Sequence, residues 1–199
     1  MVAHAKPPFK SYAQAGQDRF AYEIIGDTGT YLEIGANSPI NINNTYGLER
    51  LGWTGLSVDN SGASMEAFER ERKNFFYLTD AAAPQSWQAA LAQAGLPIDH
   101  IDYLSLDIDE ATLQCLSNLP LRDLRFSVLT VETDEYRLPG RRDAILEILR
   151  FHGYDVLASD VMDQGLSFEV WAVNPRTVDM ARAEKFRRDK PTEWREFFV

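Results

Sequence analysis

Four acidic residues directly follow two apolar stretches of the sequence. Asp107 and Asp109 end the stretch IDYLSLDID, and Glu132 and Asp134 end FSVLTVETD. Carboxylates that crowd together repel one another, and their pKa values rise unless a cation lies among them. Such a cluster can accept a proton in catalysis, and oxygen ligands suit Mg²⁺, Mn²⁺ or Ca²⁺ better than zinc. These four residues are therefore candidate ligands of a divalent metal.

The candidate catalytic residues of this region are Asp107, Glu132 and Glu110. Glu110 lies within one helical turn of Asp107, where a base acting on a substrate hydroxyl would stand. Structural roles are also open to this segment. Asp109 can cap the helix that begins in EATLQCL, and Glu110 can be a solvated glutamate that the helix dipole stabilises.

A second polar group surrounds a single glycine in the stretch YLEIGANSP. A dinucleotide site needs the pattern GxGxxG to hold a pyrophosphate, but Gly35 stands alone after the apolar run. S-adenosylmethionine has no phosphate and needs a turn that its adenosine and methionine parts can approach. Gly35 supplies that turn, and Glu33 and Asn37 supply polar groups near the methionyl end. The stretch therefore favours S-adenosylmethionine.

Two more acids end the next strand-like runs. Asp59 ends LSVDN, where a carboxylate can accept hydrogen bonds from both ribose hydroxyls, although this feature would suit NAD equally well. Asp80 ends LTD, where it can accept from the adenine amino group while the Ala81 N–H donates to the ring. Each acid can also be a solvated turn residue or a helix N-cap.

Strand-like and helix-like stretches alternate along the chain. The helices are expected at 16–25, 44–51, 64–73, 85–94, from about 110 to 116, and 141–151, and the strands at 30–35, 51–60, 75–81, 101–109, 126–134, 154–160 and 166–174. Continuous apolar strands between helices indicate a parallel sheet that is buried on both faces, and the last two strands read as a hairpin. In such sheets ligands bind beyond the carboxyl ends of the strands. We therefore predict an α/β class I methyltransferase Rossmann-like fold, with a mostly parallel seven-stranded sheet and a C-terminal antiparallel hairpin.

The length of 199 residues fits a single domain. We expect its core at about 11–175 and a C-terminal helical tail at 176–199. The tail spaces Phe186, Trp194, Phe197 and Phe198 for a helix face that docks on the domain or on a second subunit of a homodimer.

Charge and composition limit the partners. The formal net charge of −10 opposes binding to nucleic acid and to anionic membranes. No apolar run is long enough to span a bilayer, and the start MVAHAKPPFK lacks the apolar core of a secretory signal. Cys115 is the single cysteine, which fits a reduced thiol in the cytoplasm and a packed core position. The expected partner is a small-molecule acceptor substrate.

Six stretches resemble, in order, the signature segments of the FkbM-type methyltransferase family. They are SYAQAGQD, YLEIGAN, NNTYGLERLGWTGLSVDN, IDYLSLDID, VLTVETD and FEVWAVNP, which together run from Ser11 to Pro175. The resemblance implies a Rossmann-like class I fold, S-adenosylmethionine as the methyl donor, and O-methylation of sugars, polyketides or other secondary metabolites. Gln14, Gln17 and Asp18 precede the first strand and are candidate lid contacts over the cofactor. The candidate cofactor-binding residues are Gln17, Glu33, Gly35, Ala36, Asn37, Thr45, Asp59, Asn60, Asp80, Ala81 and Asp107.

The chain departs from the family pattern around the acceptor. The family motif K-I-D-x-E-G reads SLDIDE at residues 105–110, so the lysine and the final glycine are absent. The family's Glu-His-Asn is Glu132-Thr133-Asp134 here, and Val170 rather than an acid precedes Trp171. These departures concern the substrate and the accepting atom.

The leading hypothesis is an S-adenosylmethionine-dependent O-methyltransferase that acts on a hydroxyl of a sugar or secondary metabolite. Mg²⁺ or Mn²⁺ is a candidate metal cofactor. N-methylation of an amine or amide, including one on a peptide, is the first alternative. An inactive cofactor-binding subunit is the second, because the lysine of the motif is missing. An NAD-dependent oxidoreductase would explain Asp59 but lacks GxGxxG and leaves the hairpin without a role.

Overall fold

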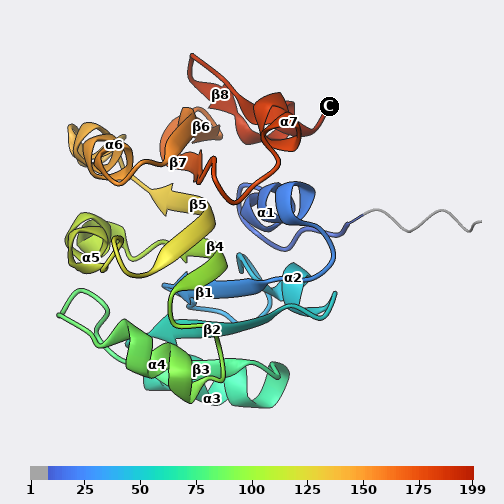
Figure 1. Ribbon diagram of the computed structural model, residues 1–199, viewed down its shortest axis with the longest axis vertical. Helices are drawn as coiled ribbons and strands as arrows, with labels where there is room; N and C mark the ends of the chain where they lie inside the picture. Colours follow the sequence, from blue (N-terminus) through green and yellow to red (C-terminus); the bar gives the residue numbers. More distant parts are fainter. Residues whose placement is uncertain (1–8) are drawn as a thin grey trace, which may run out of the picture.

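A single twisted sheet of eight strands organises the computed structural model, which describes residues 9–199 (Figure 1). The strand order is β3-β2-β1-β4-β5-β7-β6-β8. The strands are β1 Thr30–Ile34, β2 Thr54–Asp59, β3 Phe75–Leu78, β4 His100–Leu106, β5 Arg125–Glu132, β6 Asp155–Asp163, β7 Leu166–Val173 and β8 Thr192–Glu193.

Strand directions confirm the predicted mostly parallel sheet with a C-terminal antiparallel hairpin. The strands β3, β2, β1, β4 and β5 pair in parallel, whereas β7 is antiparallel to both β5 and β6. The sheet has one strand more than the seven expected, because Thr192 and Glu193 add to β6 at the edge.

Helices cover both faces of the sheet. They are α1 Gln17–Ile25, α2 Tyr46–Glu49, α3 Gly62–Glu71, α4 Trp87–Gln93, α5 Thr112–Asn118, α6 Arg141–Phe151 and α7 Met180–Ala183. In Figure 1, α4, α5 and α6 lie on one side of the strands, and α1 and α7 lie on the other. Side chains alternate between the faces along each strand, so Leu32 joins the core under α4 to α6 while Tyr31 joins the core under α1.

Cys115 occupies the position expected for a packed thiol. It is buried on α5 within the core formed with α4 and α6. Burial raises the pKa of the Cys115 thiol to about 12, so the nucleophilic thiolate is scarce near neutral pH.

The tail after Pro175 is not the continuous helix that its aromatic spacing predicts. It contains α7, two 3-10 helices at Glu184–Phe186 and Trp194–Phe198, and β8 between them. The helical segment ends where Arg187 is extended, with φ of −69° and ψ of 127°, and Pro191 favours an extended residue before β8. Phe186 and Phe197 are buried against the domain core around Trp171. Within residues 9–199, no helix is long and apolar enough to cross a membrane.

Candidate active site

A cleft of about 420 Å³ opens at the carboxyl ends of β1, β2, β3, β4 and β5. This is the edge at which open α/β sheets bind ligands, and the volume lies in the usual range for a small-molecule pocket. Many of the residues predicted from the sequence line it: Glu33, Gly35, Asn37, Asp59, Asn60, Asp80, Ala81, Asp107, Asp109 and Glu132.

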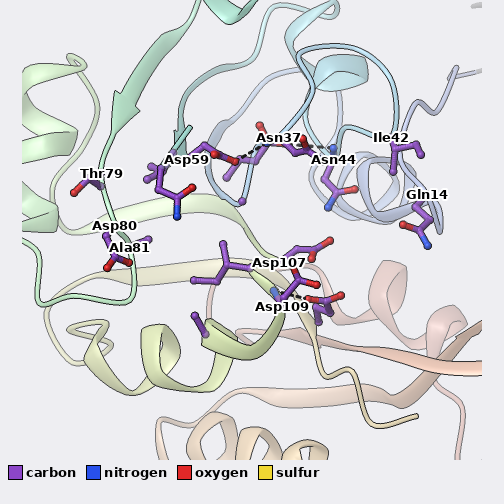
Figure 2. A pocket seen from close by; sticks show the side chains of 17 residues that line it. Gln14, Asn37, Ile42, Asn44, Asp59, Thr79, Asp80, Ala81, Asp107 and Asp109 are labelled. Atoms are coloured by element: carbon purple, nitrogen blue, oxygen red, sulfur yellow. Dashed lines mark hydrogen bonds between the residues drawn. The ribbon is translucent and has the colours of Figure 1, made fainter. Parts of the chain in front are cut away.

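The lining residues follow a clear order along the cleft (Figure 2). Asp80 and Ala81 lie at one end, Asp59 lies between, and Gln14 and Ile42 lie at the other end. The residues predicted to contact adenine and ribose therefore line the same cleft as Asp107, which is predicted to lie near the acceptor.

Gly35 is required by the protein itself as well as by the predicted ligand. Its φ is 93°, and a Cβ atom there would stand 1.6 Å from the backbone oxygen of Asp107. The Gly35 N–H also donates to Val58 O over 2.9 Å. The glycine thus allows the end of β1 to pass closely between the ends of β2 and β4, where the floor of the cleft forms.

Asp59 joins two turns at the middle of the cleft. One carboxylate oxygen accepts from the Asn37 N–H at 2.8 Å and the other from the Ser61 N–H at 2.9 Å. A carboxylate oxygen has two lone pairs, so each retains capacity for a ligand hydroxyl. Asp80 accepts from the Ala82 N–H at 3.0 Å and is exposed to the cleft.

The Glu33 carboxylate accepts more hydrogen bonds from the protein than the sequence indicates. It is buried and accepts from the Asn44 N–H, the Thr45 hydroxyl and the Ser57 hydroxyl at 3.2, 2.8 and 2.8 Å. Burial raises the pKa of Glu33, while Arg72 and these hydrogen bonds oppose the rise. Thr45 is fully buried and does not line the cleft, so its hydroxyl is available to the Glu33 carboxylate and not to a ligand.

Four other predicted residues also lie outside the cleft lining: Gln17, Ala36, Glu110 and Asp134. Gln17 is buried, accepts from the Ala15 N–H at 2.7 Å and donates to Glu169 at 3.4 Å. Glu110 is exposed on a 3-10 helix at Asp109–Ala111 and lies 3.4 Å from Arg137. The turn after β4 thus directs Glu110 towards Arg137 and solvent.

Asp107 and Glu132, which both line the cleft, form a hydrogen-bonded carboxyl pair. Burial, followed by the neighbouring Asp107 carboxylate, raises the pKa of Glu132 well above its usual range. Burial also raises the pKa of Asp107, and the hydrogen bond from Glu132 opposes this rise. The Asp109 N–H donates to Glu132 at 3.0 Å. The two carboxyl groups therefore favour sharing one proton, and Asp107 lines the cleft as a candidate proton acceptor.

A third buried acid, Glu169, lies beside this pair. Glu169 on β7 is the register partner of Glu132 on β5, and directly opposed residues present their side chains on the same face. Glu169 accepts from the Trp171 indole N–H at 2.5 Å, and burial raises its pKa. The family pattern has an acid immediately before this tryptophan, whereas Val170 stands there in this chain and Glu169 lies two residues before Trp171. The alternation of a strand, which places Glu169 and Trp171 on one face, was the available signal.

Asp109, Glu132 and Asp134 offer ligand atoms that all lie within 4.8 Å of one another. Asp107, the fourth predicted ligand, is not part of this group. Arg137 lies among the acids: its Nη2 is 3.1 Å from Asp109 and forms an ion pair with Asp134. The carboxylate set fits a hard divalent cation, but the cluster already holds a guanidinium that the sequence analysis missed.

No protein-family model matches the chain, and no curated protein matches it. Among solved structures, an O-methyltransferase from Bacillus cereus in complex with S-adenosylhomocysteine is similar at 16% identity, over 84% of this chain and 84% of that chain, with a TM-score of 0.51. The fibrillarin/Nop5p complex matches at 14% identity over 75% of this chain and 74% of that chain, with a TM-score of 0.50. The glycopeptide N-methyltransferase MtfA, complexed with S-adenosylmethionine, aligns at 17% identity over 87% of this chain and 100% of that chain, with a TM-score of 0.49.

Identities of this size bear on the fold alone. The chain has a Rossmann-like methyltransferase fold, with a mostly parallel sheet that ends in antiparallel strands.

Proposed function

We propose that the protein is an S-adenosylmethionine-dependent methyltransferase that methylates a hydroxyl oxygen of a small molecule, such as a sugar or a secondary metabolite. The observation that carries this proposal is the layout of one cleft. Asp59 and Asp80, the proposed hydrogen-bond acceptors for the ribose and the adenine, line the same cleft as Asp107, which is hydrogen-bonded to Glu132.

The proposed reaction needs a proton acceptor beside the methyl group. The hydroxyl oxygen attacks the methyl carbon, the new C–O bond forms as the C–S bond breaks, and the sulfonium becomes a neutral thioether. The hydroxyl proton passes to the Asp107 carboxylate, whose raised pKa makes it a stronger base than an ordinary aspartate. Glu132 holds Asp107 in place through its own proton. Orientation of the two reactants in the cleft supplies much of the remaining acceleration.

Metal assistance is a further part of the proposal. Asp109, Glu132 and Asp134 would hold Mg²⁺ or Mn²⁺, and the ion would lower the pKa of the acceptor hydroxyl. Arg137 would then have to leave Asp109 and Asp134. If a metal assists, EDTA abolishes turnover and either ion restores it, and the Arg137→Gln variant needs less metal. Full turnover of chelated enzyme would leave the carboxyl pair as the sole activating group.

N-methylation of an amine or amide is the second candidate. The acids at the acceptor end, including Asp109, Glu132 and Asp134, favour an approaching protonated amine electrostatically. The base that accepts a hydroxyl proton can equally accept a proton from nitrogen. Fragmentation of the methylated product in a mass spectrometer assigns the methyl group to oxygen or nitrogen and so distinguishes the two.

The deciding experiment combines cofactor binding with turnover. We expect S-adenosylhomocysteine, and not NADH, to bind in a calorimeter, and we expect a cell extract to yield products heavier by one methyl group. Glu132→Gln should bind S-adenosylhomocysteine and lose turnover. Binding without any methylated product across extracts would instead favour an inactive cofactor-binding subunit. The proposal fails if S-adenosylhomocysteine does not bind.

The cellular setting completes the proposal. We propose a cytoplasmic enzyme of FkbM-like type, with residues 11–175 as its catalytic core, residues 176–199 as a covering tail, and a homodimer as its assembled form. The net charge of −10 supports a small-molecule partner rather than nucleic acid or membrane lipid.

A further inference from the structure

One wall of the cleft is the loop at residues 36–45, which connects β1 to α2. Asn37, Ile42 and Asn44 on this loop line the cleft. Two of these residues have left-handed backbones, with φ of 45° at Asn37 and 52° at Ile42. The left-handed region is unfavourable for side chains other than glycine, and a β-branched isoleucine is rare there. Such conformations persist only where neighbouring groups enforce them.

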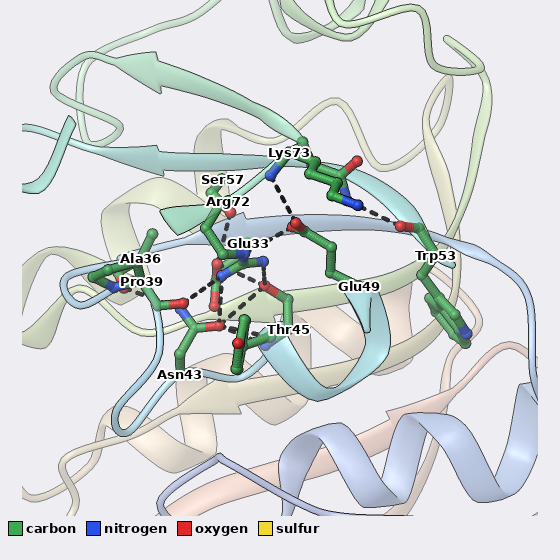
Figure 3. A network of polar contacts seen from close by, with 12 residues as sticks. Glu33, Ala36, Pro39, Asn43, Thr45, Glu49, Trp53, Ser57, Arg72 and Lys73 are labelled. Atoms are coloured by element: carbon green, nitrogen blue, oxygen red, sulfur yellow. Dashed lines mark hydrogen bonds and ion pairs between the residues drawn. The ribbon is translucent and has the colours of Figure 1, made fainter. Parts of the chain in front are cut away.

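Arg72 is the neighbouring group that holds this loop (Figure 3). Arg72 directly follows α3 and is 7% exposed. Each of its five N–H groups donates a hydrogen bond to a separate acceptor. The acceptors are Glu49 Oε2 at 2.7 Å from Nε, Pro39 O and Asn43 Oδ1 at 2.9 and 3.1 Å from Nη1, and Thr45 Oγ1 and Tyr31 OH at 3.0 and 3.0 Å from Nη2. Pro39, Asn43 and Thr45 belong to the loop.

Asn43 connects Arg72 by hydrogen bonds to both ends of the loop. Its amide NH₂ donates to Ala36 O and Ser38 O at 3.3 and 2.9 Å, near the start of the loop. Its carbonyl oxygen accepts from the Thr45 and Tyr46 N–H groups at 3.0 and 2.7 Å, at the end of the loop. Because Asn43 is 1% exposed, these contacts are shielded from water.

We propose that Arg72 is a positioning residue of the cofactor site, acting through Asn43 and Thr45 to fix the cleft wall; this inference rests on the proposed function. Arg72 also reaches Glu33 indirectly, since Thr45 Oγ1 accepts from Arg72 and donates to Glu33 at 2.8 Å. Lysine cannot replace this arginine, because an ammonium has three donors and no planar fork.

The test compares Arg72→Lys and Asn43→Ala with the matched control Tyr31→Phe. Tyr31 is also an acceptor of Arg72, but it lies on β1 outside the loop and outside the cleft lining. At temperatures where all the proteins are folded, calorimetry measures the dissociation constant of S-adenosylhomocysteine. We expect Arg72→Lys and Asn43→Ala to weaken binding at least about tenfold, the value of one buried hydrogen bond, and Tyr31→Phe to change it less than about threefold.

Amide hydrogen exchange in the ligand-free proteins provides the second readout. Arg72→Lys should speed exchange at Asn43, Asn44 and Thr45 while exchange in β4 and β5 stays unchanged. A general loss of stability would instead speed exchange across the sheet and weaken binding in the Tyr31→Phe control as well. If Arg72→Lys does not fold, Asn43→Ala decides.

Two results would overturn the role of Arg72: unchanged loop exchange in the variants, or wild-type affinity for S-adenosylhomocysteine despite faster loop exchange. Failure of the wild-type protein to bind S-adenosylhomocysteine would refute the proposed function instead. In that case the exchange data would still decide whether Arg72 fixes the loop.

Discussion

Asp59 is the single residue whose removal should reduce cofactor affinity most directly. Asp59→Ala removes the acceptor proposed for the ribose hydroxyls and also frees the Asn37 N–H. We expect S-adenosylhomocysteine binding to weaken by about 1.5–3 kcal/mol, the usual range for hydrogen bonds to a charged group. Asp102→Ala is the matched control, because the Asp102 carboxylate also accepts a hydrogen bond from a backbone N–H, that of Thr30, but lies near the amino end of β4 and outside the cleft lining. Equal losses in both variants would refute the assignment.

Ile42 should limit the stability of the fold while it shapes the cleft. Its side chain is 68% exposed, so little burial is lost on replacement, and its φ of 52° suits asparagine far better than isoleucine. We expect Ile42→Asn to raise the free energy of unfolding by about 1 kcal/mol in urea titrations. Ile98→Asn makes the same change at a residue that is 49% exposed and has no positive φ. A gain in both variants, or in neither, would show that backbone strain is not the cause.

The residues that sequence reasoning identified and those it missed differ in a physical way. Asp59, Asp107 and Glu132 were identified because an apolar run ends at the edge of the sheet, and polar residues at that point face the cleft. Arg72 was missed because its partners lie in other segments of the chain. Arg137 follows its partner Asp134 by only three residues, but its second partner, Asp109, lies in a distant segment. Glu33 was placed correctly at the cleft, but its three protein donors come from a loop and a neighbouring strand that local spacing cannot position.

At the scale of elements, the segment before α1 is tied down by one buried acid. Asp18 accepts from the Ser11 hydroxyl and from the Tyr12 N–H, and this brings Gln14 over the cleft. Burial raises the pKa of Asp18 to about 6 from 3.8. The native state therefore binds this proton more tightly than the unfolded chain does.

This shift predicts a pH dependence with a definite sign. The stabilising effect of the Asp18 proton is complete below pH 3.8 and is lost as the pH rises through about 6. The free energy of unfolding of the wild type, minus that of Asp18→Asn, should fall by roughly 3 kcal/mol across this interval. Urea titrations of both proteins at pH 4, 5, 6 and 7 measure it, since other carboxyl groups cancel in the difference. A flat or rising difference would contradict the burial of this acid.

Regular elements were easier to predict than the loops between them. The parallel strands and the hairpin follow from apolar runs and alternation, which are local properties. The loop at 36–45 adopts left-handed residues because Arg72 and Asn43 enforce them. The two-residue strand β8 exists because the tail happens to lie against β6, and two residues carry no periodic signal.

For the whole molecule, the continuity of the sheet determines how it should unfold. The sheet runs without a break from β3 at one edge to β8 at the other, and strands such as β1 contribute to the cores on both faces. Neither face can lose its core while the other remains intact. We therefore expect one cooperative transition, with coincident urea curves from circular dichroism and tryptophan fluorescence.

Ligand linkage extends this expectation to parts of the protein that do not touch the cleft. S-adenosylhomocysteine at about 100 times its dissociation constant should stabilise the native state by about 2.7 kcal/mol. If the sheet is one unit, the slowest-exchanging amides of β1, at the cleft, and of β6, beside the tail, should both slow by about 100-fold, because both exchange only on global unfolding. A protein with two units would gain this protection in β1 alone, and its fluorescence and circular dichroism curves would separate when the ligand is added. The Asp59→Ala variant serves as the control, since the same ligand concentration should protect both strands much less.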